Sequence, residues 1–219
     1  MESSSQTLET RWLGRISFPD ALQLQESMVQ QRHNGEIPDT LLLLEHEPVY
    51  TIGRTADQTS LKDARDTTVP VFQTNRGGQA TYHGPGQLVG YVILDLNTLG
   101  RDLHRYLRTL EQALIDCCFS VGIPASRRDG LTGVWVGDRK LASIGVGVRK
   151  WVTMHGFAIN VSRDLTGFAS IVPCGIQGVS MTSIGTELSR PMTVQEFAPL
   201  CQPFLEHRIL ELRSPPAVS

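Results

Sequence analysis

The chain has 219 residues, of which 40% are hydrophobic and 19% are charged, and this composition predicts one folded domain of ordinary size. The formal net charge of −2 gives no general attraction to nucleic acid or to an anionic membrane, so neither is expected as a partner. There is no apolar run of about 18 residues to span a bilayer and no basic stretch followed by an apolar leader. We therefore expect a cytoplasmic protein whose thiols stay reduced.

The N-terminal part predicts a strand, a helix and a second strand. After a polar tail at residues 1–10, residues 11–16 have the pattern of a first strand. Pro19 marks the start of an amphipathic helix that closes near Gly35. Residues 40–44 form a continuous apolar run of strand length, which is typical of a strand buried on both faces.

The middle of the chain contains a glycine-rich segment between two regular regions. Residues 45–54 are polar and turn-rich, and residues 76–87 are glycine-rich and precede an apolar strand at 88–94. Apolar side chains recur at helical spacing over residues 103–121, and Gly122 is placed to cap the C-terminus of that helix.

The C-terminal half predicts more sheet and a last helix. Residues 133–136 and 141–146 flank a turn and predict a hairpin, and residues 151–161 continue the sheet. A capping box at Thr193 opens a helix over residues 193–212, in which two prolines are expected to cause kinks. Because helices interleave with strands and hairpins, we predict an α/β (α+β) fold, a mixed sheet flanked by helices in a single domain over residues 1–219.

The segment from Arg76 to Gln87 is the most informative part of the sequence. It contains four glycines, Pro85, an arginine and His83 within twelve residues. Glycine allows backbone N–H groups to approach a ligand closely, so the segment is expected to present its backbone at a surface. An ordinary hairpin loop would explain a glycine-rich segment equally well if it stood alone.

Four cysteines lack the C-x-x-C spacing of a zinc site. Cys117 and Cys118 lie on the apolar stripe of the predicted helix, so they are read as core residues. Cys174 is flanked by Pro173 and Gly175, which suggests a thiol on an exposed bend, although a small buried residue fits the same pattern.

A nucleophilic cysteine needs a nearby cation, because an ordinary thiol is mostly protonated at neutral pH. Lys140 begins the second strand of the predicted hairpin and precedes apolar and small residues, so it is a candidate for a lysine drawn into the fold. Its position alone also fits a solvated hairpin lysine. His83 and His155 each precede a glycine and could exchange a proton near pH 7. No pair of histidines has recognisable ligand spacing with carboxylates, so no metal is expected.

Five blocks of the chain resemble the octanoyltransferases, also called lipoyl(octanoyl) transferases, and the likeness extends from about Trp12 to Glu187. The blocks are residues 41–54, the segment 76–91 with its Arg-Gly-Gly and His-Gly-Pro-Gly-Gln runs, residues 133–146, residues 155–160 and residues 173–176. Met154 is a local departure from the family pattern, which affects only the wall of a pocket.

The resemblance implies the fold of biotin and lipoate protein ligases and a two-step transfer without a cofactor. In that scheme Cys174 takes an octanoyl group from octanoyl-acyl carrier protein, and Lys140 lowers the pKa of the thiol. A lysine amine of a lipoyl domain, in 2-oxoacid dehydrogenase E2 subunits or the glycine cleavage H protein, then receives the octanoyl group, which is the first step of protein lipoylation. By the family pattern the substrate pocket is lined by Arg76, Gly77, Gly78, Gln79, Ala80, Thr81, Tyr82, His83, Ser143, Ile144, Gly145, Gly156, Phe157 and Ala158.

General chemistry agrees with that scheme. Thioester exchange is nearly balanced and amide formation from a thioester is downhill, so no ATP is required. Backbone N–H groups near Gly77-Gly78 or Gly156 are candidate donors to the oxyanion. The alternatives are an ATP-dependent lipoate or biotin ligase, which needs no nucleophilic cysteine, and a non-catalytic module that binds acyl carrier protein or lipoyl domains.

Overall fold

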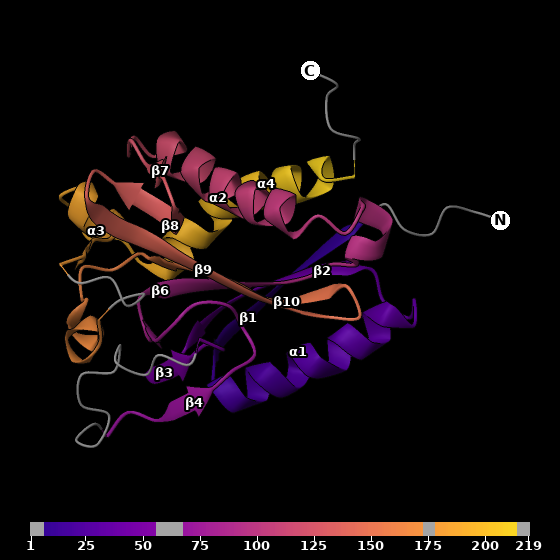
Figure 1. Cartoon of the computed structure of the whole chain (residues 1–219). Helices are drawn as coiled ribbons and strands as arrows, with labels where there is room; N and C mark the ends of the chain where they lie inside the picture. The colour runs from indigo at the N-terminus through magenta and orange to yellow at the C-terminus, as the bar shows by residue number, and fades with distance from the viewer. Residues whose placement is uncertain (1–6, 56–67, 173–177, 214–219) are drawn as a thin grey trace.

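A mixed β-sheet forms the centre of the computed structural model, which describes residues 7–55, 68–172 and 178–213 (Figure 1). The strand order is β1-β2-β6-β10-β9-β8-β7, and the short β11 pairs with β9. β1 runs parallel to β2 and β11 parallel to β9, whereas the other neighbouring strands are antiparallel. The strands are β1 (Leu8–Ile16), β2 (Asp39–His46), β6 (Gln87–Ile93), β7 (Ser126–Arg128), β8 (Leu131–Val136), β9 (Arg139–Arg149), β10 (Val152–Asn160) and β11 (Ser180–Met181).

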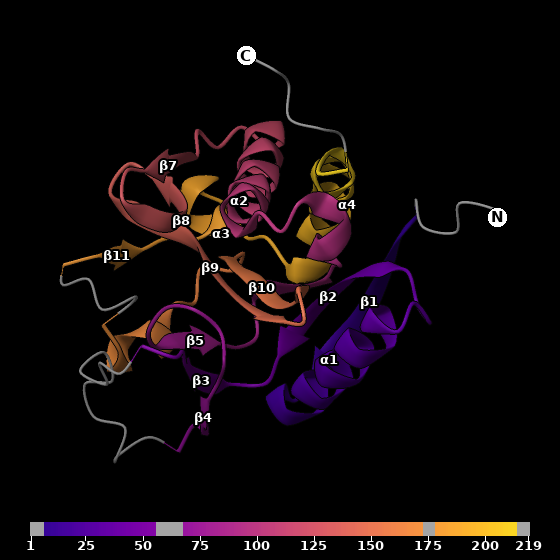
Figure 2. The ribbon, with the colours of Figure 1, turned by 45° about the vertical axis from the view of Figure 1, so that its right-hand side comes forward.

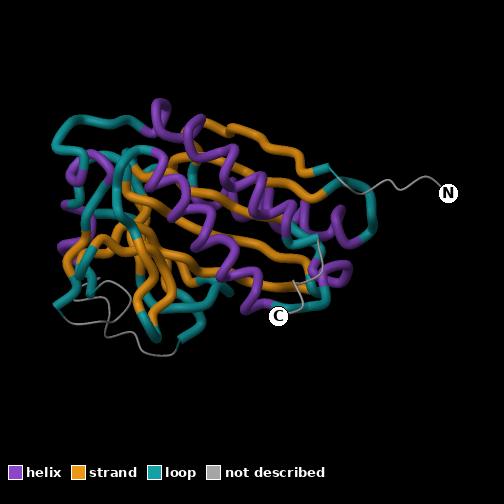
Figure 3. Tube along the Cα trace, turned by 90° about the horizontal axis from the view of Figure 1, so that it is seen from above, coloured by secondary structure: helices purple, strands orange, loops and turns teal. Residues whose placement is uncertain are grey.

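Helices cover both faces of this sheet. α2 and α4 lie on one face and α1 lies on the other, as Figures 1 and 2 show from two sides. Seen from above, the helices run along the strands (Figure 3). The helices are α1 (Phe18–His33), α2 (Leu103–Ser120), α3 (Ile184–Glu187) and α4 (Val194–Glu211), with the 3-10 turns η2 (Leu96–Leu99) and η3 (Thr166–Ser170). None of the described helices is both long and apolar enough to cross a membrane.

Strand β2 confirms the prediction of a strand buried on both faces. Leu41 and Leu43 pack into the core beneath α2 and α4, whereas Leu42 and Leu44 pack into the core beneath α1. Successive side chains of a strand point to opposite faces, so an uninterrupted apolar run is required when both faces are covered.

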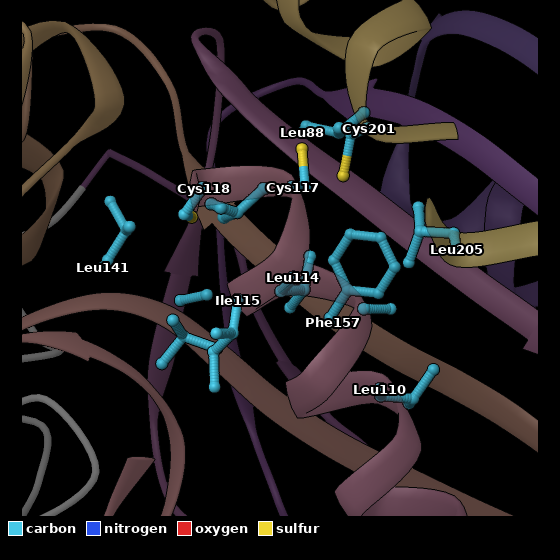
Figure 4. Close-up of a cluster of buried hydrophobic side chains, with 14 of the residues drawn as sticks. Leu88, Leu110, Leu114, Ile115, Cys117, Cys118, Leu141, Phe157, Cys201 and Leu205 are labelled. Atoms are coloured by element: carbon cyan, nitrogen blue, oxygen red, sulfur yellow. The ribbon is translucent and has the colours of Figure 1, made fainter. Parts of the chain in front are cut away.

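Three cysteines are part of the core beneath α2 and α4. Cys117, Cys118 and Cys201 are fully buried, and Figure 4 shows them among leucines and Phe157. Burial raises the pKa of the Cys118 thiol far above its ordinary value, so that thiol stays protonated and unreactive. The prediction that Cys117 and Cys118 are core residues is confirmed.

Helix ends agree with the sequence, and the last helix has the extent predicted for residues 193–212. Gly122 adopts φ +84° after α2, and its N–H donates to the carbonyl of Phe119 (3.0 Å). The capping box at Thr193 is present at the start of α4. α4 then runs as one helix through Pro199 and Pro203.

A second, smaller sheet corrects the turn-rich reading of residues 45–54. This sheet has the order β4-β3-β5, with β3 (Val49–Ile52), β4 (Val71–Gln73) and β5 (Thr81–His83). The strands are only three or four residues long, and β3 pairs with segments far away in the sequence. Their local pattern is too short to show a period, so non-local pairing decides their conformation.

Candidate active site

A pocket lies between the glycine-rich segment and the middle of strands β9 and β10. Its lining from the glycine-rich segment and β5 comprises Arg76, Gly77, Gly78, Gln79, Ala80, Thr81 and His83. Its lining from β9 and β10 comprises Ser143, Ile144, Gly145, His155, Gly156, Phe157 and Ala158. The structure therefore brings together every residue predicted for the pocket except one.

Tyr82 is that exception. Thr81, Tyr82 and His83 form β5, and successive strand residues face opposite sides. Thr81 and His83 line the pocket, whereas the ring of Tyr82 packs against Tyr50 and Phe168 with centroid distances of 5.4 and 5.7 Å. Tyr82 supports the small sheet instead of contacting the pocket.

Several lining residues were not predicted from the sequence. Phe18, Thr51, Thr74 and Tyr91 line the same pocket and come from α1, β3, the segment after β4, and β6. Tyr91 belongs to the block that carries the family resemblance, so its place in that block was the available signal. Thr51 lies in the block at residues 41–54 and had the same signal, whereas Phe18 and Thr74 have no local pattern that distinguishes them from ordinary buried residues.

Arg76 ties the glycine-rich segment to the small sheet. Its Nη2 donates to the carbonyl oxygen of Thr51 (2.6 Å) and to Thr51 Oγ1 (2.9 Å), and its Nη1 donates to the carbonyl of Gly77 (3.0 Å). The Gly77 N–H donates to the carbonyl of Val146 on β9 (2.9 Å). Gly77 is therefore wrong as a candidate oxyanion donor, because its N–H is already used to hold the segment against β9.

Glycine is required where β3 ends against this segment. A Cβ at Gly53 would lie 2.0 Å from the carbonyl oxygen of Gly78, which is impossible without moving the backbone. Gly78 itself adopts φ +84°. The close approach of the two backbones therefore explains the glycine at position 53, and the positive φ explains the glycine at position 78.

Hydrogen bonds determine which nitrogen of His83 carries its proton. Asn160 donates through Nδ2 to the carbonyl of Thr182 (3.0 Å), so its Oδ1 accepts from Gln87 Nε2 (3.0 Å). Gln87 Oε1 then faces His83 Nδ1 at 2.8 Å and can only accept. His83 is therefore protonated on Nδ1, and its Nε2 keeps a lone pair, 3.4 Å from Thr51 Oγ1.

His46 and His155 are held in the same way. His46 Nδ1 donates to the carbonyl of Ile16 (2.9 Å), so its Nε2 accepts from the hydroxyl of Tyr91 (2.6 Å). His155 Nε2 donates to Asn75 Oδ1 (2.7 Å). His155 also has φ +59°, and its N–H donates to Gln25 Oε1 (2.7 Å).

Burial keeps all three imidazoles neutral. Loss of solvent lowers the pKa of His46 and of His155 to about 4, and nearby Arg76 contributes at His155. Burial, the neighbouring His46 and Arg76 lower the pKa of His83 to about 3. These groups therefore serve as hydrogen-bonding groups near neutral pH and not as cations.

The lowered pKa values of the three histidines lead us to expect that the protein is less stable in acid. Unfolded histidines bind protons below about pH 6.5, whereas these folded ones do so only near pH 3 to 4, so the unfolded state binds more protons between those values. The free energy of unfolding should fall as the pH drops through this window, by up to about 1.4 kcal/mol per pH unit for each histidine.

Denaturant unfolding from pH 7.5 to 4.5 measures this effect. We expect His155→Asn to make the free energy of unfolding depend less steeply on pH, by the equivalent of about one proton. Asparagine is chosen because it tolerates a positive φ. His33→Gln is the matched control, because His33 is exposed at the end of α1. Equal slopes for the wild type and His155→Asn would contradict the assignment.

Lys140 is buried, so the alternative of a solvated hairpin lysine is wrong. Only 2% of the residue is exposed, and its Nζ donates to the carbonyl of Thr132 (3.1 Å) and lies 5.2 Å from the centre of the Trp135 ring. A Cβ at Gly133 would lie 2.9 Å from Lys140 Cε, so the side chain is tightly packed. Lys140 is not among the residues that line the pocket.

Cys174, the predicted nucleophile, lies outside the described residues. The chain before it is anchored, because Ile171 is buried in a cluster with Tyr50, Ala80 and Phe168. The hydroxyl of Tyr50 also donates to the carbonyl of Gly167 (2.8 Å). Within the part of the chain that the structure describes, no group of three or more His, Cys, Asp or Glu side chains is arranged to hold a metal ion.

Comparison with known proteins identifies the family. Residues 17–205 match the lipoyl protein ligase A/B catalytic domain. The chain is 53% identical over 184 residues to an octanoyltransferase of Geobacter sulfurreducens, which covers 84% of this chain and 77% of the relative. It is 52% identical over 182 residues to an octanoyltransferase of Geobacter metallireducens, covering 83% and 84%. The chain belongs to the octanoyltransferase family. The prediction of an acyltransferase is thereby confirmed.

Solved structures confirm the predicted ligase-like fold of this octanoyltransferase family member. A lipoate-protein ligase A bound with ATP superimposes with a TM-score of 0.68 at 17% identity, covering 92% of this chain and 85% of the ligase. A biotin protein ligase from Aquifex aeolicus superimposes with a TM-score of 0.56 at 12% identity, covering 95% and 72%. At these identities the likeness shows the fold alone.

Proposed function

We propose that this acyltransferase takes an octanoyl group from octanoyl-acyl carrier protein onto Cys174 and passes it to a lysine of a lipoyl domain. The observation that carries the proposal is the pocket, found in a chain about half identical to named octanoyltransferases. The pocket combines apolar walls from Phe18, Ile144 and Phe157 with a glycine-rich backbone. An eight-carbon chain gains about 0.8 kcal/mol per buried CH2, so such walls favour it.

The transfer divides into two substitutions at one carbonyl carbon. In the first, the Cys174 thiolate attacks the thioester, a bond forms from sulfur to carbon, and the carrier thiolate leaves and is protonated. In the second, the neutral lysine amine attacks the acyl-enzyme, loses a proton and releases the Cys174 thiolate. Lys140 is the proposed partner that favours the thiolate, because its ammonium is held inside the fold by the carbonyl of Thr132.

The oxyanion requires donors that are not already engaged. Because the Gly77 N–H binds Val146, and Gly156 is paired within the sheet with Tyr91 on one side and Gly145 on the other, the proposal is confined to Gly78, which lines the pocket. Neutral His83 is an acceptor at Nε2, where the Thr51 hydroxyl donates a long hydrogen bond of 3.4 Å. A neutral acceptor can hold an attacking amine without repelling it as a cation would.

The experiment that tests the function needs no nucleotide. Purified protein, octanoyl-acyl carrier protein and an unmodified lipoyl domain are mixed without ATP, and intact mass is expected to show the octanoyl group on the lipoyl domain. A lipoyl domain whose target lysine is changed to arginine is the control and should stay unmodified. Modification that requires ATP and free octanoate would overturn the proposal and favour a ligase.

A further inference from the structure

Thr182 connects Lys140 to the hydrogen bonds of the pocket. Its N–H donates to the carbonyl of Lys140 (2.9 Å), and its own carbonyl accepts from Asn160 Nδ2 (3.0 Å). Its hydroxyl donates to Glu187 Oε1 (2.5 Å). Thr182 is 1% exposed, so all of these groups are removed from water and each needs its partner.

Glu187 joins Thr182 to the residue before Lys140. Its two carboxylate oxygens accept from Arg139 Nε (3.0 Å) and Arg139 Nη2 (2.9 Å). Burial pulls the pKa of Glu187 upward, but the hydrogen bonds from Arg139 and Thr182 outweigh it and hold that pKa below its ordinary value. Glu187 is therefore an ionised acceptor shared by β9 and the residue that follows β11.

Backbone pairing alone is too short to hold this region. β11 consists of Ser180 and Met181, which pair with Arg139 and Lys140. A two-residue pairing is weak, so the backbone hydrogen bonds of Thr182 and the side-chain bonds of Thr182 and Glu187 add to the constraint. The Arg139 side chain is 49% exposed, and an exposed ion pair adds little to the stability of the whole protein. The Arg139–Glu187 pair is therefore better explained as a device that positions β9 against Thr182.

We propose that Glu187 and Thr182 are positioning residues, which with Arg139 set the backbone of Lys140 relative to the His83 end of the pocket. The inference rests on the role of Lys140 in the proposed function. From Thr182 the hydrogen bonds continue through Asn160 and Gln87 to His83. Thr182 therefore contacts the backbone of the buried Lys140 and begins the hydrogen bonds that fix the tautomer of His83.

The test compares Glu187→Ala and Thr182→Val with Asp116→Asn. Asp116 is a matched control, because it is also a carboxylate that accepts from an arginine. Its partners are Arg208 of α4 (2.7 Å) and Gln112 of its own helix α2 (2.7 Å). The measurements are kcat and KM with octanoyl-acyl carrier protein, the midpoint of thermal unfolding, and the rate of Cys174 alkylation by iodoacetamide against pH.

We expect Glu187→Ala and Thr182→Val each to lower kcat by about 10- to 100-fold, as displacements of about 1 Å do, with a smaller change in KM. The alkylation profile of Cys174 should move to higher pH. The double variant should resemble either single one, because the two residues act as a unit. Glu187→Gln keeps an acceptor for Thr182 and should be intermediate.

Two results would overturn the inference and are distinguishable. If the two variants lose no more activity than Asp116→Asn at equal thermal stability, with the alkylation profile of the wild type, their role is structural only. If Lys140→Met also leaves the alkylation profile and acylation unchanged, the proposed role of Lys140 fails and the positioning role fails with it.

Discussion

Cys174→Ala is expected to yield a folded protein that never acquires an octanoyl group. Removing the thiol removes the only atom that the proposed mechanism uses to form the acyl-enzyme, so transfer should fall by at least about a thousandfold. Intact mass of the wild type after mixing with octanoyl-acyl carrier protein should show a single adduct. Peptide mapping should place that adduct on the peptide that contains Cys174.

Cys201→Ala is the matched control for this experiment. Cys201 is fully buried in the core, and its hydrogen bond with Cys117, together with burial and the neighbouring Cys118, raises its pKa well above the ordinary value. Its replacement should cost about 1 kcal/mol of stability and leave the adduct in place. An octanoyl adduct that persists in Cys174→Ala would reject the assignment of the nucleophile.

Lys140→Met is expected to raise the pH at which Cys174 becomes reactive and to slow acylation. Methionine is close to lysine in shape but carries no charge, so it fits between Gly133 and Trp135 while it removes the cation. The rate of iodoacetamide alkylation of Cys174 against pH measures the effect. If the ammonium stabilises the thiolate, the profile should move upward by about one pH unit or more.

Lys140→Arg separates charge from size. It keeps the positive charge, but the guanidinium is larger and the site is tightly packed, so overpacking should cost about 1 to 3 kcal/mol. We expect partial recovery of thiolate formation and impaired proton transfer, because arginine does not lose its proton. Alkylation profiles that superimpose for the wild type and both variants would remove Lys140 from the mechanism.

Most of the pocket could be predicted from the sequence because its residues form contiguous blocks. The run from Arg76 to His83 and the two triplets at 143–145 and 156–158 all reach the pocket except for Tyr82. The prediction for Tyr82 was wrong because the resemblance marks the segment as a whole. Side chains alternate along β5, so the side chain of Tyr82 points to the face opposite the pocket. Phe18 and Thr74 could not be predicted, since they lie outside these blocks and reach the pocket from α1 and from the segment after β4.

The sequence by itself determined the features that depend on local periodicity. The apolar run of β2, the stripe of α2 with Gly122 after it and the capping box of α4 all follow from side-chain pattern and backbone preference within one segment. Only the tertiary structure decided the electrostatic state of the site. The three neutral histidines have no local burial signal, and the pattern around Lys140 left a buried and a solvated lysine both open. The hydrogen-bond partners of His46 and His155 are distant in the sequence. Removal from water by the packed chain lowers the pKa values of all three histidines.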